Sequence, residues 1–277
     1  MQDSNNIQIR DHDKLITGMR SMGIELTETQ LAQFDRFYEL LIEWNEKMNL
    51  TGITEYEEVI QKHFIDSASL VKVYDADKIQ RQCQESEKNG TSSMPAIKIL
   101  DMGTGAGFPG IPLKIVFPEV EFVLMDSLNK RINFLNEVIR VLGLTKITAV
   151  HARAEEYARK PEYREQFDLC VSRAVARLNT LAEFCMPFVK PGGLFIPYKS
   201  GKIQEELEEA DYAIRLLGGD KPKVEAFTLP NSDIERTFVC IKKKKETPSV
   251  YPRAGGKPLK APLIKQEKKE QKKTAKK

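Results

Sequence analysis

The chain has 277 residues, of which 41% are hydrophobic and 30% are charged, and its mean hydropathy is −0.42. Such a chain can bury one large core, or one core and a small appendage. No stretch approaches the roughly 18 consecutive apolar residues that a membrane helix needs, and the start lacks the basic-then-apolar design of a secretory signal. We therefore expect a cytoplasmic protein without a membrane segment.

The cysteines and histidines argue against a disulfide framework and against a metal site. Four cysteines are too few for such a framework, and none of them forms a Cys-x-x-Cys pair. The three histidines show no metal-ligand spacing. The composition therefore predicts a reducing compartment and no bound metal.

The net charge of +3 is unevenly distributed. Residues 242–277 carry 14 basic and 3 acidic side chains, so the rest of the chain is acidic. This asymmetry predicts an acidic enzyme body with a basic arm for a polyanion, most simply nucleic acid. The last dozen residues also have the composition of a disordered, solubilising tail.

Residues 1–74 have a helical pattern. Thr27 and Gln30 form a capping-box signature before a run of apolar residues at three- and four-residue steps. These residues are Leu31, Phe34, Phe37, Tyr38, Leu41, Trp44 and Met48. A shorter helical pattern spans residues 55–73, and residues 75–96 form a polar stretch that predicts a surface insertion or linker.

From residue 97 onward, short apolar runs alternate with helical stretches. The predicted strands are 97–102, 121–126, 147–150, 167–172 and 193–198, and the predicted helices are 111–117, 130–142, 178–189 and 203–217. This alternation predicts an α/β fold with a doubly wound, mostly parallel sheet. The last two strand-like runs have no helix between them, which predicts an antiparallel edge. We expect this domain to span 97–245, followed by a basic segment at 246–277.

The most informative motif is LDMGTGAGFPG at residues 100–110. It follows a predicted strand and precedes a helix, and Gly103, Gly105 and Gly107 allow positive φ angles and the close approach of a ligand. The next strand ends at Asp126, where a carboxylate can accept hydrogen bonds from both ribose hydroxyls of an adenosine. The pattern predicts a nucleotide-type cofactor site.

Two cofactor classes fit this pattern. A dinucleotide brings a pyrophosphate, which the Asp101 carboxylate would repel. S-adenosylmethionine carries no phosphate, and its cationic sulfonium and amino groups suit Asp101 better. An NAD-dependent oxidoreductase therefore stays open as the alternative enzyme class, and a turn or cap role stays open for Asp101.

Two further loops lie where parallel strands end. Glu155 follows the third predicted strand and is placed to meet the adenine edge, and Arg173 follows the fourth and points to the same crevice. We consider Arg173 the strongest polar candidate, with a surface or ion-paired arginine as its alternative.

Seven motifs together resemble the RsmG (GidB) family of bacterial 16S rRNA 7-methylguanosine methyltransferases, over residues 27–263. They are MNLTGIT (48–54), KHFIDSASL (62–70), ILDMGTGAGFPGIPL (99–113), ARAEE (152–156), VSRAVA (171–176), PGG (191–193) and YPRAGGKPLKAPL (251–263). The resemblance implies a Rossmann-like class I methyltransferase fold, S-adenosylmethionine as the methyl donor, and ring nitrogen 7 of a 16S rRNA guanine as the acceptor. It places five residues at the cofactor: Gly103, Phe108, Ala154, Glu155 and Arg173.

The implied chemistry needs little from the protein besides positioning. Ring nitrogen 7 of guanine has an in-plane lone pair and no proton, so no general base is required. The loop at Arg173 lacks the Asn/Asp-Pro-Pro-Tyr/Phe run of enzymes that methylate exocyclic amines, and the cysteines in strand-like runs have the character of buried, inert thiols. We predict Arg173 as the catalytic residue and no covalent intermediate.

Six residues are candidates for RNA contact: Asn49, Thr51, His63, Arg253, Lys257 and Lys260. Helix capping is the alternative for the first two, and a structural role is the alternative for the histidine. The expected partner is 16S rRNA or the small ribosomal subunit, and the expected state is a monomer. A non-catalytic RNA-binding or ribosome-assembly module stays open as another function. Deleting residues 242–277 is expected to weaken RNA binding and to leave cofactor binding nearly unchanged.

Overall fold

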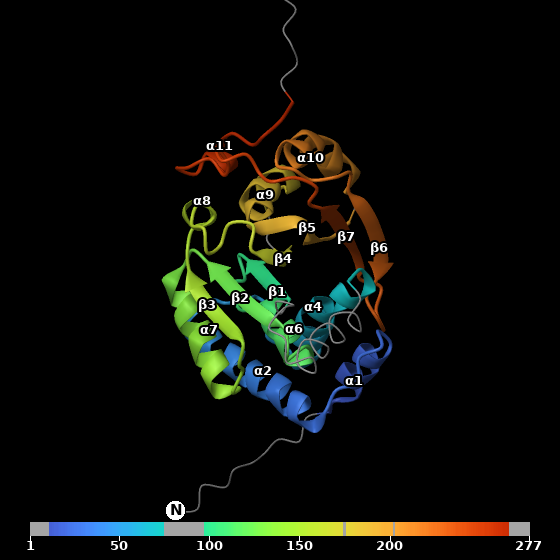
Figure 1. Ribbon diagram of the computed structural model, residues 1–277. Coiled ribbons are helices and arrows are strands. Elements are labelled where there is room, and N and C mark those ends of the chain that lie inside the picture. Colours follow the sequence, from blue (N-terminus) through green and yellow to red (C-terminus); the bar gives the residue numbers. More distant parts are fainter. Residues whose placement is uncertain (1–10, 75–96, 174–175, 202, 266–277) are drawn as a thin grey trace, which may run out of the picture.

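The computed structural model describes residues 11–74, 97–173, 176–201 and 203–265, and Figure 1 shows their arrangement. In the described residues, seven strands form one sheet in the order β3-β2-β1-β4-β5-β7-β6. The strands are β1 (Lys98–Met102), β2 (Glu121–Asp126), β3 (Ile147–His151), β4 (Phe167–Ser172), β5 (Val189–Lys199), β6 (Lys223–Thr228) and β7 (Glu235–Lys242). The first five are parallel, and β7 runs antiparallel to both β5 and β6. The predicted doubly wound sheet with an antiparallel edge is confirmed.

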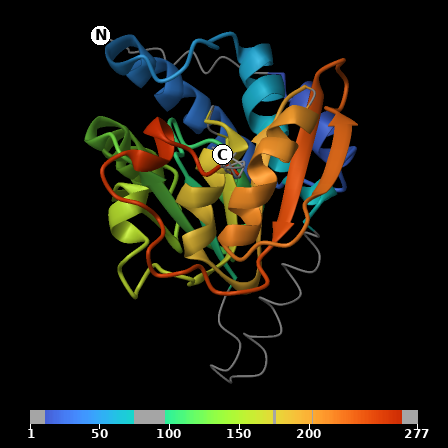
Figure 2. The ribbon, with the colours of Figure 1, turned by 90° about the horizontal axis from the view of Figure 1, so that it is seen from above.

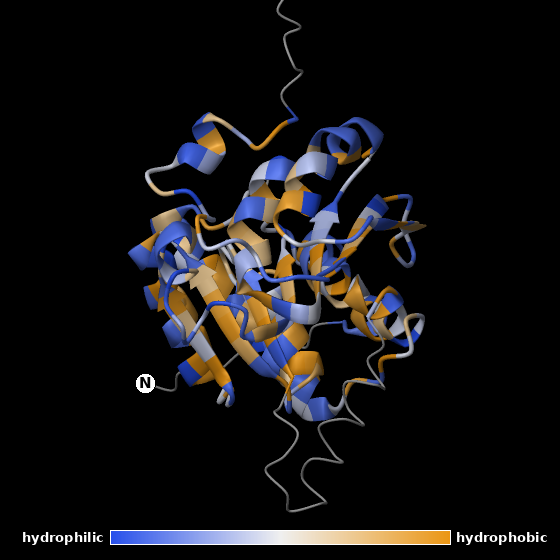
Figure 3. Cartoon of the chain, turned by 45° about the horizontal axis from the view of Figure 1, so that its top comes forward, coloured by the Kyte–Doolittle hydropathy of each residue, from blue (hydrophilic) through white to orange (hydrophobic). Residues whose placement is uncertain are grey.

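Helices cover both faces of this sheet (Figures 1 and 2). One face packs against α2 (Glu28–Met48), α6 (Gly110–Val116) and α7 (Asn129–Val141), and the other packs against α8 (Ala154–Tyr157), α9 (Leu178–Cys185) and α10 (Gln204–Leu216). Within β1, Ile99 belongs to the first core and Leu100 to the second. This alternation explains why neighbouring residues of the strand are both apolar, and Figure 3 shows hydrophobic residues, in orange, concentrated in the strands of the sheet.

The N-terminal helices begin and end as local sequence dictates. The Thr27 hydroxyl accepts a hydrogen bond from the Gln30 backbone N–H at 3.3 Å, and the Gln30 side chain accepts one from the Thr27 N–H at 2.9 Å. This capping box starts α2, as predicted. The helical pattern at 55–73 divides into α3 (Tyr56–Val59), a π-helical turn η1 (Ile60–Ile65), α4 (Asp66–Ala68) and a 3-10 turn η2 (Ser69–Lys72), and α1 (Asp13–Arg20) precedes α2.

The N-terminal helices share one hydrophobic core with the sheet. Phe64 of η1 lies between Phe34 and Phe37 of α2, and its ring centroid is 4.9 and 5.7 Å from theirs. Phe37 in turn lies 5.3 Å from Phe108, which follows the first strand. The N-terminal helices are therefore packed directly behind the glycine loop. The division of the chain into the regions predicted from sequence stays a prediction.

Two predicted boundaries are wrong near the fifth strand. The helix predicted to reach 189 ends at Cys185 and is followed by a 3-10 turn, η3 (Met186–Phe188), because Pro187 has no N–H to continue the ladder. The strand β5 begins at Val189, earlier than predicted, and its pairing with β4 shifts register there. The Pro-Gly-Gly run therefore lies within a strand as an irregularity, where Gly192 adopts a φ of 93°.

The basic arm predicted from residue 242 is folded as far as the structure describes it. Lys243 is fully buried, and its ammonium donates to the Glu165 carboxylate at 2.9 Å and to the Met186 carbonyl at 2.8 Å. Burial lowers the pKa of Lys243. The segment after it crosses the α9 face (Figures 1 and 2) and ends in the short helix α11 (Lys257–Lys260). The predicted insertion at 75–96 and the tail at 266–277 lie outside the described residues.

None of the helices in the described ranges is long and apolar enough to cross a membrane.

Candidate functional site

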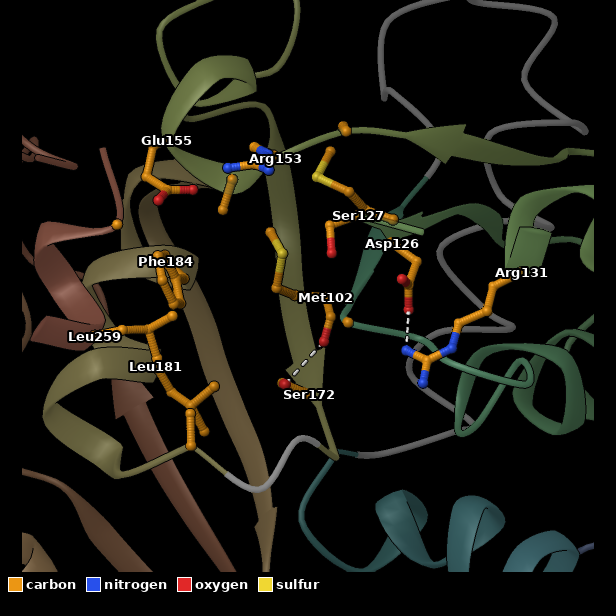
Figure 4. Close-up of a pocket in the computed structure, with 16 residues that line it drawn as sticks. Met102, Asp126, Ser127, Arg131, Arg153, Glu155, Ser172, Leu181, Phe184 and Leu259 are labelled. Carbon is orange, nitrogen blue, oxygen red and sulfur yellow. Dashed lines mark hydrogen bonds and ion pairs between the residues drawn. The ribbon is translucent and has the colours of Figure 1, made fainter. Parts of the chain in front are cut away.

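A cavity of about 450 Å³ lies at the carboxyl ends of β1, β2 and β4, where open α/β sheets bind their ligands. Figure 4 shows its lining side chains. They come from the ends of four strands, from the helices α7, α8 and α9, and from the C-terminal segment. The lining residues are Met102, Gly103, Met125, Asp126, Ser127, Arg131, Ala152, Arg153, Ala154, Glu155, Ser172, Ala176, Leu181, Phe184, Gly256 and Leu259.

The glycine loop has the backbone geometry that its sequence requires. Gly103, Gly105 and Gly107 have φ angles of 70°, 61° and 91°, in the left-handed region that favours glycine. A Cβ at Gly107 would also lie 2.6 Å from the Ile111 side chain. Of these glycines only Gly103 lines the cavity. The other two shape the loop that carries it.

Asp101 lies beneath the glycine loop and does not line the cavity. Its Oδ2 accepts hydrogen bonds from the Thr104 hydroxyl at 2.6 Å and from the Gly110 N–H at 2.8 Å. Its Oδ1 is buried without a partner among the described residues, and burial raises the pKa of Asp101 to about 6. The cofactor contact predicted for Asp101 stays a prediction, and the carboxylate is separated from the cavity by the glycine loop. Its carboxylate occupies the N-terminus of α6, where a pyrophosphate would otherwise bind.

Asp126 ends β2 and faces the cavity (Figure 4). Its Oδ1 accepts from the Leu128 N–H at 2.9 Å, and its Oδ2 accepts from the Gly105 N–H at 3.0 Å and from Arg131 Nη1 at 3.1 Å. These bonds fix the carboxylate at the position predicted for ribose recognition. Arg131 was not predicted from the sequence, although it is a basic residue in the first turn of the helix that follows β2.

The opposite wall of the cavity is largely apolar. Ala154 and Glu155 line it at the start of α8, as predicted from sequence. Figure 4 shows Glu155 and Phe184 across the cavity from Asp126. The sequence analysis did not identify Phe184 or Leu259, because an apolar residue on a helix is equally typical of a buried core. The cavity thus pairs an apolar wall with a fixed carboxylate.

A second cavity of about 640 Å³ is lined by Arg173, the residue that directly follows β4. Ser172 lines the first cavity and Arg173 the second, and Ala176 and Arg177 repeat the pattern further along the chain. The residues that line the second cavity are Ile53, Lys62, His63, Asp66, Arg173, Arg177, Tyr198, Lys199, Ser200, Glu205, Glu206 and Arg236. Neighbouring residues at the carboxyl end of β4 therefore line two different cavities.

Arg173 is held by groups of the N-terminal helical region. Its Nη1 donates to the Lys62 carbonyl at 3.0 Å and to Asp66 Oδ2 at 3.1 Å, and its Nη2 donates to His63 Nδ1 at 3.1 Å. The guanidinium also lies 5.1 Å from the ring centroid of Phe108. Arg173 therefore borders the second cavity, and neither Arg173 nor Phe108 lines the first.

His63 is a buried neutral ring in the same cluster. It stacks on Phe108 with the centroids 4.3 Å apart. Its Nδ1 lies 3.1 Å from Arg173 Nη2 and 3.0 Å from the Lys62 carbonyl oxygen, and its Nε2 lies 3.0 Å from Thr51 Oγ1. Burial, followed by the nearby charge of Arg173, lowers the pKa of His63 to about 3. The structure thus brings together Thr51, His63, Phe108 and Arg173, which lie far apart in the sequence.

Asp66 joins two arginines at the second cavity, and the sequence analysis did not identify it. Its Oδ2 pairs with Arg173, and its Oδ1 accepts from Arg236 Nε at 2.9 Å. Only 3% of its side chain is exposed. Both oxygens of this buried carboxylate therefore have an arginine partner.

The candidate RNA contacts have different surroundings. Asn49 is the left-handed C-cap of α2 with a φ of 51°, in agreement with the capping alternative. Arg253 is paired with the fully buried Glu183, which accepts from its Nε at 2.9 Å and its Nη2 at 2.6 Å, so this guanidinium has a structural role. Lys257 and Lys260 are exposed and have no ion-pair partner among the described residues.

Within the ranges that the structure describes, no group of three or more histidine, cysteine, aspartate or glutamate side chains is placed to hold a metal ion.

Residues 30–236 match the GidB family model, described as rRNA small subunit methyltransferase G. A relative named ribosomal RNA small subunit methyltransferase G from Lachnoclostridium phytofermentans is 60% identical, over 92% of this chain and 99% of the relative. A relative of the same name from Desulforamulus reducens is 48% identical over 88% of this chain and 95% of the relative. A solved SAM-dependent methyltransferase from Aquifex aeolicus is 16% identical over 62% of this chain and 92% of that chain, with a TM-score of 0.40, which is too low to inform function.

Proposed function

Because the chain belongs to the rRNA small subunit methyltransferase G family, we propose that it transfers the methyl group of S-adenosylmethionine to ring nitrogen 7 of a guanine in 16S rRNA. The observation that carries this proposal is that two neighbouring residues at the end of β4 line two different cavities, Ser172 the first and Arg173 the second. A group transfer between two bound molecules needs two such adjoining spaces.

The lining of the first cavity fits S-adenosylmethionine. Its apolar wall, which includes Phe184, suits the adenine, and the fixed carboxylate of Asp126 suits the ribose hydroxyls. Asp101 adds negative charge beneath the loop, which favours a cationic ligand. A dinucleotide fits less well, because Asp101 already fills the N-terminus of α6. This argues against the oxidoreductase alternative.

The cofactor would supply an electrophilic methyl carbon at its sulfonium. The lone pair of guanine N7 would form the new C–N bond while the electron pair of the C–S bond stays with sulfur. No proton moves in this step, so the chain needs no general base. Its own residues then have three tasks: to hold the methyl donor, to hold the guanine, and to align the two.

Arg173 is the residue best placed to align the two ligands. It follows Ser172 directly and is fixed by Asp66, His63 and the Lys62 carbonyl. The second cavity would take the guanine, because its basic residues can donate to the guanine O6 and to a phosphate. In this role Arg173 would shape the wall against which the base stacks.

The RNA would also contact the C-terminal segment. Lys257 and Lys260 are exposed on α11, beside the mouth of the first cavity where Leu259 lies. Since a ribosomal RNA or a small subunit is the substrate, the enzyme would act in the cytoplasm. The monomeric state stays a prediction.

The test is the transfer of a labelled methyl group from S-adenosylmethionine to 16S rRNA, both free and in 30S particles, followed by nucleoside analysis. Label in 7-methylguanosine is the expected result. If the chain binds the cofactor and labels neither RNA, the proposed acceptor is wrong, and the binding-module alternative gains support.

A further inference from the structure

The C-terminal segment, residues 251–263, reaches the first cavity and supplies part of its wall. Gly256 and Leu259 both line the cavity, although more than 70 residues separate them from the next lining residue along the chain. Figure 4 shows Leu259 beside Phe184 and Leu181, on the side opposite Asp126. This segment carried the sequence motif that pointed to RNA, and the structure brings it to the cofactor space instead.

Leu259 presents exposed apolar surface to the first cavity. Its exposed fraction is 62%. The neighbouring apolar lining residue Leu181 is only 2% exposed. A ligand that fills the cavity would cover Leu259 and remove its apolar surface from water.

The segment is anchored on both sides of Leu259. Before it, Arg253 is bound by Glu183 of α9 through its backbone N–H at 2.8 Å and through its guanidinium. At α11 itself, the Thr180 hydroxyl donates to the Pro258 carbonyl at 3.2 Å. After it, Leu263 belongs to the buried core on the α9 face. The position of Leu259 is therefore fixed by the fold and does not depend on a ligand.

A second set of anchors ties the start of the segment to the turn after α8. Arg159 donates to the Pro252 carbonyl at 2.7 Å, and Arg164 donates to the Tyr251 carbonyl at 3.0 Å. The α8 region contributes Ala154 and Glu155 to the same cavity. These bonds place the C-terminal segment and the α8 loop in one rigid wall.

We propose that the C-terminal segment is part of the cofactor site, with Leu259 as a direct contact and the Arg253–Glu183 pair as the positioning element that holds it. This inference rests on the proposed function, since it takes S-adenosylmethionine as the occupant of the first cavity. Lys257 and Lys260 flank Leu259 and stay exposed, so one short helix offers an apolar contact to the cofactor and a basic surface to RNA.

The experiment measures the dissociation constant of S-adenosylhomocysteine, the demethylated cofactor, by calorimetry for the parent and for Leu259→Ala. We expect binding to weaken about tenfold, since the side chain loses about two methylene groups of contact. We also expect the KM for the cofactor to rise by the same factor, with kcat at saturating cofactor unchanged. Because Leu259 is exposed, the thermal midpoint of the unliganded variant should equal that of the parent.

The matched control is Ile264→Ala. Ile264 directly follows the C-terminal segment and is 57% exposed, but it does not line the first cavity. This variant should bind the cofactor as the parent does. A second measurement compares hydrogen exchange of the 254–260 amides with and without S-adenosylhomocysteine, and ligand protection is expected.

Two failures can be told apart. If the parent binds S-adenosylhomocysteine but Leu259→Ala binds equally well and the 254–260 amides gain no protection, the C-terminal segment is not part of the site. If the parent binds neither form of the cofactor, the proposed function is itself wrong, and this inference is lost with it.

Discussion

Arg173 and Asp66 form an ion pair, with Nη1 and Oδ2 3.1 Å apart, that joins the end of β4 to the N-terminal helical region. Asp66 also pairs with Arg236 of β7, so three separate parts of the chain meet at one carboxylate. The N-terminal helices are thus not an accessory to the sheet. They supply the groups that fix the orientation of Arg173 at the second cavity.

Replacing Arg173 by alanine should disrupt the alignment of the methyl donor with the guanine and leave the fold intact. Asp66 keeps its pair with Arg236, so the variant does not leave an uncompensated buried charge. We expect kcat for methyl transfer to fall by about 100-fold or more, with cofactor affinity changed little. Rates measured at saturating cofactor check this. Arg140→Ala, an exposed arginine on α7, is the control that removes the same charge, and an unchanged rate in Arg173→Ala would contradict the assigned role.

His63 should make the stability of the protein depend on pH. Folded His63 stays neutral because its pKa is lowered to about 3, whereas the unfolded ring takes up a proton below its ordinary pKa of about 6.5. Lowering the pH therefore favours the unfolded state, by about 2 kcal/mol between pH 7.5 and pH 5.0 for this group.

Urea unfolding of the parent and of His63→Gln at the two pH values measures this difference. The variant should lose less free energy of unfolding on acidification than the parent does. Asp101, whose pKa is raised to about 6, acts in the opposite direction, but it contributes equally to both proteins. Equal losses in the two proteins would show that His63 is protonated in the folded state.

Two substitutions at Asp101 separate its charge from its hydrogen bonds. Asp101→Ala removes the acceptor of the Gly110 N–H and should cost about 1–3 kcal/mol of stability. Asp101→Asn keeps an acceptor oxygen, so its free energy of unfolding should stay closer to that of the parent.

Both Asp101 variants should bind S-adenosylhomocysteine less tightly if the loop geometry is affected. S-adenosylmethionine carries a cationic sulfonium where S-adenosylhomocysteine has a neutral thioether, so loss of the Asp101 charge in Asp101→Asn should weaken binding of the former more, by about three- to tenfold. Calorimetry with both ligands measures this. In the parent, the preference for S-adenosylmethionine over S-adenosylhomocysteine should also decline as the pH falls through about 6, because Asp101 loses its charge. If Asp101→Asn weakened the binding of both ligands equally, a role for the charge would be excluded.

Lys257 and Lys260 should contribute to RNA affinity through phosphate contacts. The double alanine variant should bind 16S rRNA more weakly, and the slope of log affinity against log salt should become shallower by about 1.4 to 1.8 for two lost contacts. Lys98→Ala is a suitable control, because Lys98 starts β1 and pairs with Glu121. An unchanged slope in the double variant would exclude phosphate contact at α11.

The deletion of 242–277 that the sequence favours is not a clean test of RNA binding. It would remove the buried Lys243 together with Leu259 of the first cavity, so it would disturb the proposed cofactor site as well as the basic segment. A truncation after residue 265 keeps every described contact. We expect that variant to retain the parental affinity for the cofactor, which calorimetry can check.

The ion pair between Arg253 and Glu183 should be important for stability. Arg253→Ala leaves the fully buried Glu183 without its charged partner and should cost about 3–5 kcal/mol. Arg215→Ala, which removes an exposed arginine from α10, should cost less than about 1 kcal/mol. The free energy of unfolding in urea, measured for both variants, checks this. If Arg253→Ala cost no more free energy of unfolding than Arg215→Ala, the buried pair would not contribute to stability as expected.

The sequence allowed the sheet and one wall of the first cavity to be predicted, because these depend on local signals. The sequence alone shows the glycine spacing and places Asp126 at the end of a strand. Because the strands are parallel, their carboxyl ends lie together at one edge of the sheet. The other wall depends on contacts between distant residues. Nothing near Leu259 indicates that α9 lies beneath it.

The structural ion pairs of two basic residues could not be predicted from the sequence, for a physical reason. Lys243 and Arg253 lie in a basic, Pro- and Gly-containing segment, and such residues are usually solvated. Each is committed instead to one carboxylate, Glu165 or Glu183, more than 65 residues away in the chain. Pairing of this kind carries no local pattern, so only the three-dimensional structure separates a structural cation from a free one.

Ser172 and Arg173 are neighbours in the chain, and each lines a different cavity. In the proposed function each of these cavities holds one ligand. Neither ligand would have to leave before the other exchanges, so the kinetics should follow a random-order sequential scheme without a substituted-enzyme form. The same geometry suits a bisubstrate inhibitor: an adenosine analogue joined to a purine by a short linker at the level of residue 172 would span both spaces at once.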